Sequence, residues 1–64
     1  MKLRKLLLLM DGTQPVKVVT DIDGQGEDFV EVYLGVSNEA KVIHGDMKIV
    51  DIRHTAAYLE IEVE

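Results

Sequence analysis

A chain of 64 residues without cysteine is a single domain, residues 1–64, whose small core neither a disulfide nor a thiolate metal site can reinforce. The composition is 47% hydrophobic, which favours stabilisation by a very apolar core or by self-association. The formal net charge of −5 repels phosphate backbones, so no direct binding to nucleic acid is expected, whereas a basic protein surface would be attracted.

The first ten residues combine the cations Lys2, Arg4 and Lys5 with an apolar run over residues 6–10. This run is shorter than a signal-peptide core and stops at Asp11, so we expect no secretion signal. The chain also lacks the stretch of about 20 apolar residues that a membrane-spanning helix needs. We therefore expect no membrane partner and a location in the cytoplasm.

Residues 2–10 are predicted to form a helix, because apolar residues recur on one face at helical spacing: Leu3, Leu6, Leu7 and Met10. Leu8 and Leu9 lie on the other side of this helix, together with Lys5. A helix that is apolar nearly all round favours burial on more than one side. We therefore expect Leu8 and Leu9 to contribute to a contact between copies of the chain. The alternative is that Leu9 tucks into the edge of the sheet.

The β-branched residues of 16–21 predict a strand, and the residues of 29–34 predict a second strand. The glycines in the turn over 23–26 join the two strands as a hairpin. Residues 37–44 are predicted to form a short helix that Ser37 caps and Gly45 ends, with a strand over 41–44 as the alternative.

Residues 47–53 are predicted as a third strand and residues 58–64 as a fourth, with a turn over 54–57. The order is therefore α-β-β-α-β-β. It predicts an α+β fold in which an N-terminal helix covers one face of a four-stranded, mostly antiparallel sheet. The expected core comprises Leu3, Leu6, Leu7, Met10, Val16, Val18, Val30, Val32, Leu34, Val50, Ile52, Leu59, Ile61 and Val63.

Three segments carry a pattern seen elsewhere: the opening KLRKLLLLMDGTQPVKVVTDIDG, the strand KIVDI and the closing YLEIEVE. In these segments the chain resembles small acidic, uncharacterised proteins encoded in phages and prophages of Gram-positive bacteria. The resemblance spans most of the chain but matches least over residues 24–46. It implies a phage context, and hence the cytoplasm of a bacterial host cell, without implying an activity or site residues.

The chain offers little that indicates catalysis or metal binding. Asp21, Asp23 and Gly26 match positions 1, 3 and 6 of a calcium-binding loop, but Val32 stands where the closing glutamate is required. His44 and His54 lie on different predicted elements and lack further ligands of suitable spacing. No serine elbow is present. We therefore expect no enzyme, no cofactor and no metal.

Besides the Leu8–Leu9 side of the helix, a second predicted surface favours binding to another protein. The face of the sheet away from the helix would present an apolar stripe of Val19, Tyr33, Ile49 and Tyr58 with an acidic rim, and an apolar centre with a polar rim is typical of interfaces. The alternative is ordinary cross-strand packing. The residues assigned to partner contact are Glu31, Tyr33, Ile49, Asp51, Tyr58, Glu60, Glu62 and Glu64, and those assigned to an oligomer interface are Leu8, Leu9 and Val19.

These features predict a small binding protein that engages and blocks a host protein with a basic surface, such as a CRISPR or other defence effector. The alternating carboxylates Glu60, Glu62 and Glu64 could partly imitate a row of phosphates, or could merely keep the sheet soluble. Two other functions stay open. One is a structural or regulatory phage accessory domain, and the other is an oligomeric sponge for an anionic nucleotide signal.

Overall fold

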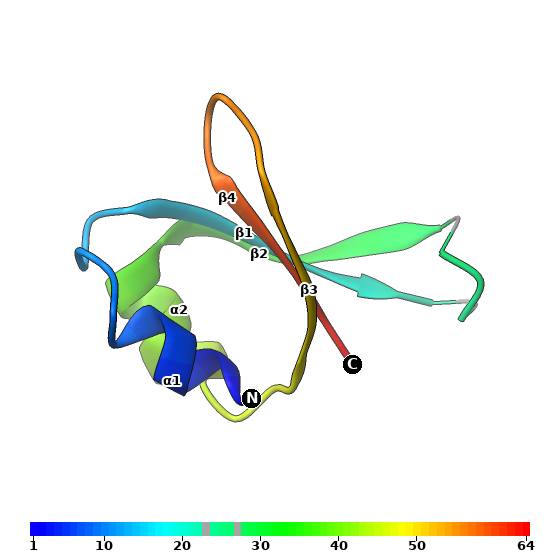
Figure 1. Ribbon diagram of the computed structural model, residues 1–64, viewed down its shortest axis with the longest axis horizontal. Coiled ribbons are helices and arrows are strands. Elements are labelled where there is room, and N and C mark those ends of the chain that lie inside the picture. The colour runs from blue at the N-terminus through cyan, green and yellow to red at the C-terminus, as the bar shows by residue number, and fades with distance from the viewer. Residues whose placement is uncertain (23, 27) are drawn as a thin grey trace.

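The computed structural model of the chain describes residues 1–22, 24–26 and 28–64. Two helices and four strands follow one another in the predicted order α-β-β-α-β-β (Figure 1). Their bounds are α1 Leu3–Leu7, β1 Pro15–Asp21, β2 Phe29–Val36, α2 Ser37–His44, β3 Ile49–His54 and β4 Leu59–Val63. The predicted α+β class is therefore confirmed, and residues 37–44 form a helix rather than a strand.

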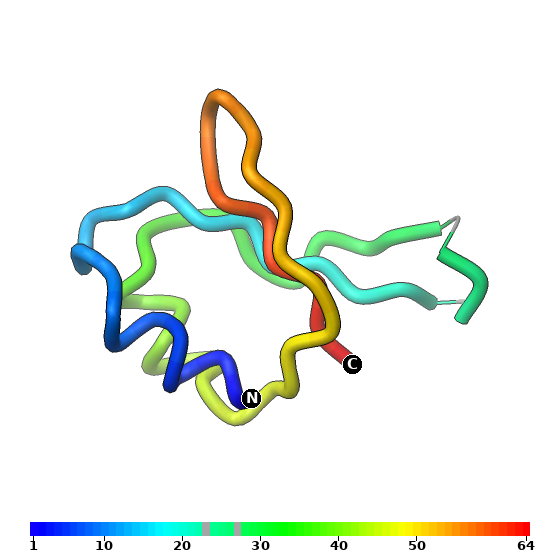
Figure 2. Tube along the Cα trace, in the orientation of Figure 1, coloured from blue at the N-terminus to red at the C-terminus, as the bar shows by residue number. Residues whose placement is uncertain are grey.

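The four strands form one mixed sheet in the order β2-β1-β4-β3. Strand β1 pairs antiparallel with β2, strand β3 pairs antiparallel with β4, and the central strands β1 and β4 run parallel. The sheet is thus mostly antiparallel, with two hairpins joined side by side through their inner strands. Figure 2 shows the strong twist that results, because the two hairpins cross rather than lie flat.

Both helices lie on the same side of the sheet, which we call the helix side (Figure 1). The buried core comprises Leu3 and Leu7 of α1, Ala40 of α2, Val16 and Val18 of β1, and Ile61 and Val63 of β4. The sequence placed six of these seven residues in the core and omitted Ala40 from its list. Cover by α2 in addition to α1 is the difference from the expected arrangement.

Helix α1 is shorter than the predicted span of residues 2–10. It ends at Leu7, and the amides of Leu9 and Met10 then bond to carbonyl oxygens only three residues back, which tightens the chain into a turn. Neither described helix is long and apolar enough to span a bilayer.

Ser37 begins α2, but its side chain does not cap the helix as predicted. Its buried hydroxyl donates a 2.6 Å hydrogen bond to the backbone carbonyl oxygen of Asp11, in the loop between α1 and β1. A second hydrogen bond also links the two helices, since the amide of Arg4 in α1 donates to the carbonyl oxygen of Gly45 directly after α2. These bonds fix both helices against one another.

Two bulges set the faces of the edge strands. In β2, Tyr33 pairs with Val18 and Glu31 pairs with Val19, so Val32 is the extra residue. In β3, Ile49 pairs with Val63 and Asp51 pairs with Glu62, so Val50 is the extra residue. Because side chains alternate between the faces, one extra residue reverses the alternation on one side of the bulge.

Four residues of the expected core are exposed as a result of these bulges and of incomplete cover. Leu34 pairs with Lys17 and faces away from the helices, and Val50 is itself a bulged residue. Val30 and Ile52 do face the helix side, opposite Thr20 and Ile61, but Val30 lies near the turn of the β1–β2 hairpin and Ile52 lies on the edge strand β3, so the helices leave both exposed. The prediction of these four as core residues is therefore wrong.

The outer half of the β1–β2 hairpin projects beyond the helices (Figure 1). Its described turn residues Gly24 and Gly26 have φ angles of 74° and 77°, a left-handed conformation that glycine adopts without strain. The Asp21 carboxylate accepts hydrogen bonds from both of their amides, at 3.2 and 2.6 Å. Of the predicted turn over 23–26, residues 24–26 thus form a bend held by Asp21, and Asp23 lies outside the described residues.

Candidate functional site

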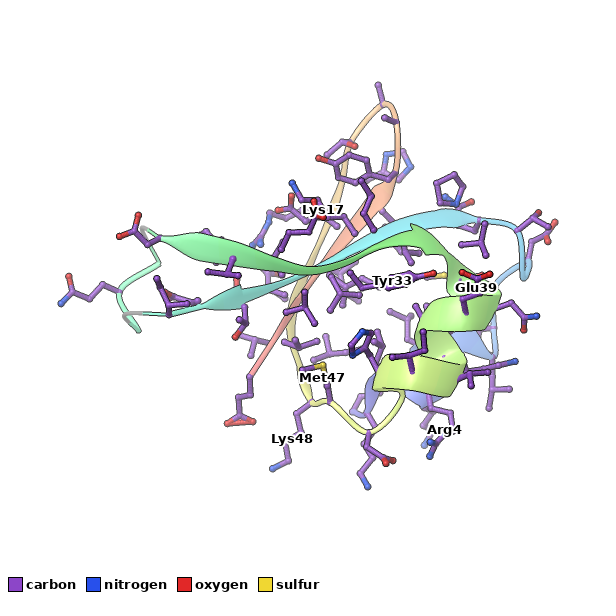
Figure 3. The ribbon with its side chains drawn as sticks, turned by 180° about the vertical axis from the view of Figure 1, so that it is seen from behind. Arg4, Lys17, Tyr33, Glu39, Met47 and Lys48 are labelled. Atoms are coloured by element: carbon purple, nitrogen blue, oxygen red, sulfur yellow. The ribbon has the colours of Figure 1, made fainter. Side chains whose placement is uncertain are left out.

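The side of the sheet opposite the helices, which we call the open face, carries most of the predicted partner residues. Direct pairing across the ladders places side chains on the same face. The open face accordingly receives alternate residues from each strand: Lys17, Val19 and Asp21 of β1, Phe29, Glu31 and Leu34 of β2, Asp51 and Arg53 of β3, and Glu60 and Glu62 of β4. Figure 3 shows Lys17 on this side, away from both helices.

The Arg53 guanidinium is the centre of a charged cluster on the open face. Its Nε donates to Glu60 Oε2 at 2.9 Å, and its Nη1 donates to Asp51 Oδ2 at 2.9 Å and to Glu62 Oε1 at 3.2 Å. The Glu60 and Glu62 side chains are only 23% and 14% exposed. The hydrogen bond that Arg53 donates to Glu60, and to a smaller extent the one it donates to Glu62, raises the pKa of Arg53. Two of the three carboxylates in the predicted phosphate-like row are therefore held by an arginine.

Phe29 and Arg53 meet above the middle of the sheet although they belong to its opposite edge strands. The guanidinium carbon of Arg53 lies 5.4 Å from the centre of the Phe29 ring, within the range of a cation–π contact. Strands β1 and β4 lie between β2 and β3, so this contact bridges both central strands. Val19 of the central strand β1 is only 3% exposed, although neither helix covers this face.

A second contact of the same kind lies at the other end of the open face. Lys17 Nζ lies 5.5 Å from the centre of the Tyr58 ring, just before β4. The face as a whole combines five carboxylates, of Asp21, Glu31, Asp51, Glu60 and Glu62, with the two cations Lys17 and Arg53, which gives a formal charge of −3. It is therefore acidic, but its charges are interleaved.

The open face retains exposed apolar surface between these charges. Leu34 is 55% exposed and Phe29 is 41% exposed, while the side chain of Asp51 is 58% exposed. Apolar side chains beside charged side chains are typical of the polar surfaces through which proteins bind one another.

The structure separates the predicted partner residues into two groups. Five lie on the open face or at its ends, namely Glu31, Asp51, Tyr58, Glu60 and Glu62, and Val19, which the sequence assigned to an oligomer interface, lies there as well. Tyr33 and Ile49 instead pack against the core on the helix side, so the prediction that they face away from the helices is wrong. The bulges at Val32 and Val50 are the cause, because each reverses the alternation that the sequence implied.

The remaining predicted residues lie elsewhere. Glu64 follows β4 as an exposed residue whose amide donates to the carbonyl oxygen of Lys48. Leu8 and Leu9 are 62% and 82% exposed at the end of α1, so Leu9 does not tuck into the sheet edge.

Sequence reasoning missed Arg53, Phe29 and Leu34. Arg53 had a usable signal, because it follows Asp51 by two residues and must share its face. The simple alternation of β2 placed Leu34 on the helix side, and the bulge that moves it to the open face leaves no mark in the residue pattern.

On the helix side, Tyr33 lies along its own strand and reaches α2. Its hydroxyl donates to Glu39 Oε2 at 2.9 Å, and its ring lies 5.6 Å from that of His44 at an angle of 57°. Figure 3 shows Tyr33 and Glu39 in this arrangement. Burial raises the pKa of Tyr33, and the hydrogen bond to Glu39 and its negative charge raise it further. This group ties β2 to α2 and has the form of a packing contact.

The described residues contain no group of three acidic, histidine or cysteine side chains placed to hold a metal ion. The His44 ring makes a tilted contact with Tyr33, whereas His54 lines a small hollow with Met10, Gln14 and Leu59. The Asp21 carboxylate of the calcium-loop candidate is bonded to backbone amides of its own turn. Comparison with known proteins finds no matching family model, no matching curated protein and no matching solved structure.

Proposed function

We propose that this chain acts by binding rather than by catalysis, and that its open face engages a protein with a basic surface. The observation that carries the proposal is the acidic open face with exposed Phe29 and Leu34 between its charges. Neither described helix covers this face. The fold therefore presents it to a partner without any rearrangement of the core.

The charges available to a partner differ from those that the sequence favoured. Glu60 and Glu62 are turned toward Arg53, which offsets part of their charge. Glu31 is exposed on the same face and is better placed to meet cations of a partner, and the Asp51 side chain is 58% exposed although it also accepts a hydrogen bond from Arg53. A scattered acidic rim around apolar residues supports recognition of a basic protein surface, and it favours imitation of a regular phosphate row less.

Within this proposal, the biological role combines the phage context that the resemblance implies with the acidic charge of the open face. The protein would occupy a basic surface of a bacterial host protein in the cytoplasm, such as a CRISPR or other defence effector, and would block its contact with nucleic acid. Charge complementarity would speed association and would weaken at high salt.

The test is a comparison of two charge-matched variants in affinity capture from host lysate, followed by mass spectrometry at low and high salt. Glu31→Lys changes the open face by two charges. Asp46→Lys makes the same change beside α1, where Asp46 forms an exposed ion pair with Arg4. We expect a partner that the wild type and Asp46→Lys retain and that Glu31→Lys loses.

The blocking role is then tested on the captured protein itself. The wild type is expected to inhibit its nucleic-acid binding, whereas Glu31→Lys is not. Capture that both variants preserve equally, or that does not weaken as salt rises, would contradict the assignment of the open face.

A further inference from the structure

The N-terminal segment is basic and the outer half of the β1–β2 hairpin is acidic, and the two lie at opposite ends of the molecule (Figure 1). The first ten residues hold three cations, Lys2, Arg4 and Lys5, and no carboxylate. Residues 18–40 contain no lysine or arginine but include five carboxylates between positions 21 and 31. Figure 1 shows α1 under one end of the molecule and the turn of the β1–β2 hairpin at the other, along its longest extent of 31 Å.

The outward side of α1, which we call the α1 outer face, is basic and apolar. Residues 5, 8 and 9 recur there at helical spacing, and Leu8 and Leu9 are 62% and 82% exposed beside the exposed Lys5. Together with Met1, Lys2 and Arg4, Lys5 and Leu8 line a shallow hollow of about 390 Å³. The hollow is bounded only by side chains from this first segment, so it is open to a group that arrives from another molecule.

The outer half of the hairpin, which we call the hairpin arm, has the complementary character. Ile22 is 64% exposed and Val30 is 44% exposed, and the exposed Asp28 lies between them in sequence. The arm is held in shape by the hydrogen bond from the Ile22 amide to the Asp28 carbonyl oxygen and by the Asp21 carboxylate in the turn. It presents apolar side chains on a preformed acidic ribbon.

These two surfaces match in both charge and polarity, and they lie too far apart to meet within one molecule. We propose that the α1 outer face of one copy binds the hairpin arm of another copy, head to tail. Ile22 and Val30 of the arm enter the space beside Leu8 and Leu9, and Asp28 faces Lys2 and Lys5, since Arg4 is already paired with Asp46. In each molecule α1 already covers the helix side of its own sheet with Leu3 and Leu7, and this contact extends such cover to the uncovered arm of a neighbour.

The geometry of the contact dictates the kind of assembly. In this head-to-tail arrangement a single contact joins two copies, so the interface is heterologous and leaves one free α1 outer face and one free arm on every pair. Association therefore continues beyond a dimer into chains or a closed ring. A contact through α1 alone, or through the arm alone, would instead be isologous and would stop at two copies.

Two blocked variants test this arrangement. Lys5→Glu with Leu9→Glu blocks the α1 outer face, and Ile22→Lys with Asp28→Lys blocks the arm. All four side chains are exposed, so the fold is expected to persist, and circular dichroism checks this. Sedimentation equilibrium of the wild type should show a mass that rises with concentration past that of a dimer and falls as salt rises.

Each blocked variant alone should remain a monomer, because it lacks one of the two required surfaces. A one-to-one mixture should form a heterodimer and nothing larger, since each variant supplies the surface that the other has lost. Should a blocked variant fail to fold, the single variants Lys5→Glu and Asp28→Lys give the same test. Each should weaken self-association, and the two mixed should restore a pair.

Two results for the wild type would overturn the proposal: it stays monomeric at millimolar concentration in low salt, or its association stops at the dimer. Two results for the blocked variants would do the same: one of them self-associates alone, or their mixture stays monomeric. Vesicles of phosphatidylglycerol serve as the competing probe. Binding of a monomeric wild type to these vesicles, lost in Lys5→Glu with Leu9→Glu, would assign the α1 outer face to an anionic membrane surface instead.

Discussion

The helix side of the sheet buries Val16, Val18 and Ile61 completely, whereas on the open face Val19 is the one buried apolar residue among those described. The helix side is built by apolar burial, with leucines of α1 packed on valines and isoleucine of the central strands. The open face is built by a guanidinium that collects three carboxylates and stacks on a phenyl ring.

This difference between the two faces shows how a chain of this length stabilises a four-stranded sheet with only two short helices. Apolar burial contributes most to stability, and a chain of this size has enough of it for one face only. The other face is closed by long amphipathic side chains, whose stems cover the sheet while their charged ends stay near water. We therefore expect substitutions on the helix side to cost much more than those on the open face.

The largest expected effect is that of Ile61→Ala, at a fully buried position in β4. Truncation of a buried isoleucine typically costs about 2–5 kcal/mol, since it removes burial and leaves a cavity. That loss is comparable with the whole stability of a domain of this size, about 3–10 kcal/mol. Urea unfolding should show a much lower midpoint or an unfolded chain. Leu9→Ala, at a position that is 82% exposed, is the control and should change stability by less than about 0.5 kcal/mol.

If Ile61→Ala and Leu9→Ala cost the same, the helix side would not be the principal core. The expectation that substitutions on the helix side cost more than those on the open face would then be wrong.

The sequence predicted the central strands better than the edge strands, and the reason is physical. In β4 the residues Leu59, Ile61 and Val63 alternate without interruption, and each edge of β4 has a neighbouring strand. In the edge strands, a bulge costs only one row of pairing, so Val32 and Val50 are accommodated and reverse the alternation. Neither bulge has a glycine or proline to mark it in the sequence.

The candidate site could be predicted only in part, because alternation within a strand can be read from the sequence whereas pairing between strands cannot. Glu60 and Glu62 were placed on the correct face because they alternate within β4, but their partner Arg53 comes from another strand. Which side chain meets which carboxylate depends on the register between β3 and β4, and this register contains a bulge. The parallel pairing of β1 with β4 is likewise a contact between distant parts of the chain that local patterns do not encode.

A smaller effect is expected on the open face, from Arg53→Met. The methionine retains an apolar stem under Phe29 but leaves Asp51, Glu60 and Glu62 without their shared cation. Because Arg53 is 37% exposed, solvent screens part of the loss, and we expect a cost of about 1–2 kcal/mol. Urea unfolding at neutral pH measures it.

A double-mutant cycle with Glu62→Gln separates the ion pair from packing. The two substitutions should be less than additive, because either one removes the same contact at 3.2 Å. Strict additivity would mean that Arg53 supports the open face only through its contact with Phe29.

The smallest effect concerns Tyr33, which links β2 to α2 on the helix side. Burial, followed by the hydrogen bond to Glu39 and its charge, raises the pKa of Tyr33 above the ordinary value of 10.0. Folding therefore favours the protonated phenol. Its contribution to stability is complete below about pH 10 and is lost as the pH rises through the higher pKa of the folded chain.

Ultraviolet titration of phenolate absorbance, with Tyr33→Phe to assign the signal, should show this raised pKa in the wild type. Glu39→Gln should lower the pKa part of the way, since burial remains. Gly35→Ala should lower it further, because a Cβ at Gly35 would overlap the Tyr33 hydroxyl and displace the ring toward water. The methyl group meets the end of a flexible side chain, so the fold should adjust around it. If the wild type, Glu39→Gln and Gly35→Ala shared the same Tyr33 pKa, the phenol would not be held between β2 and α2. The buried part of the helix side would then include only the central strands.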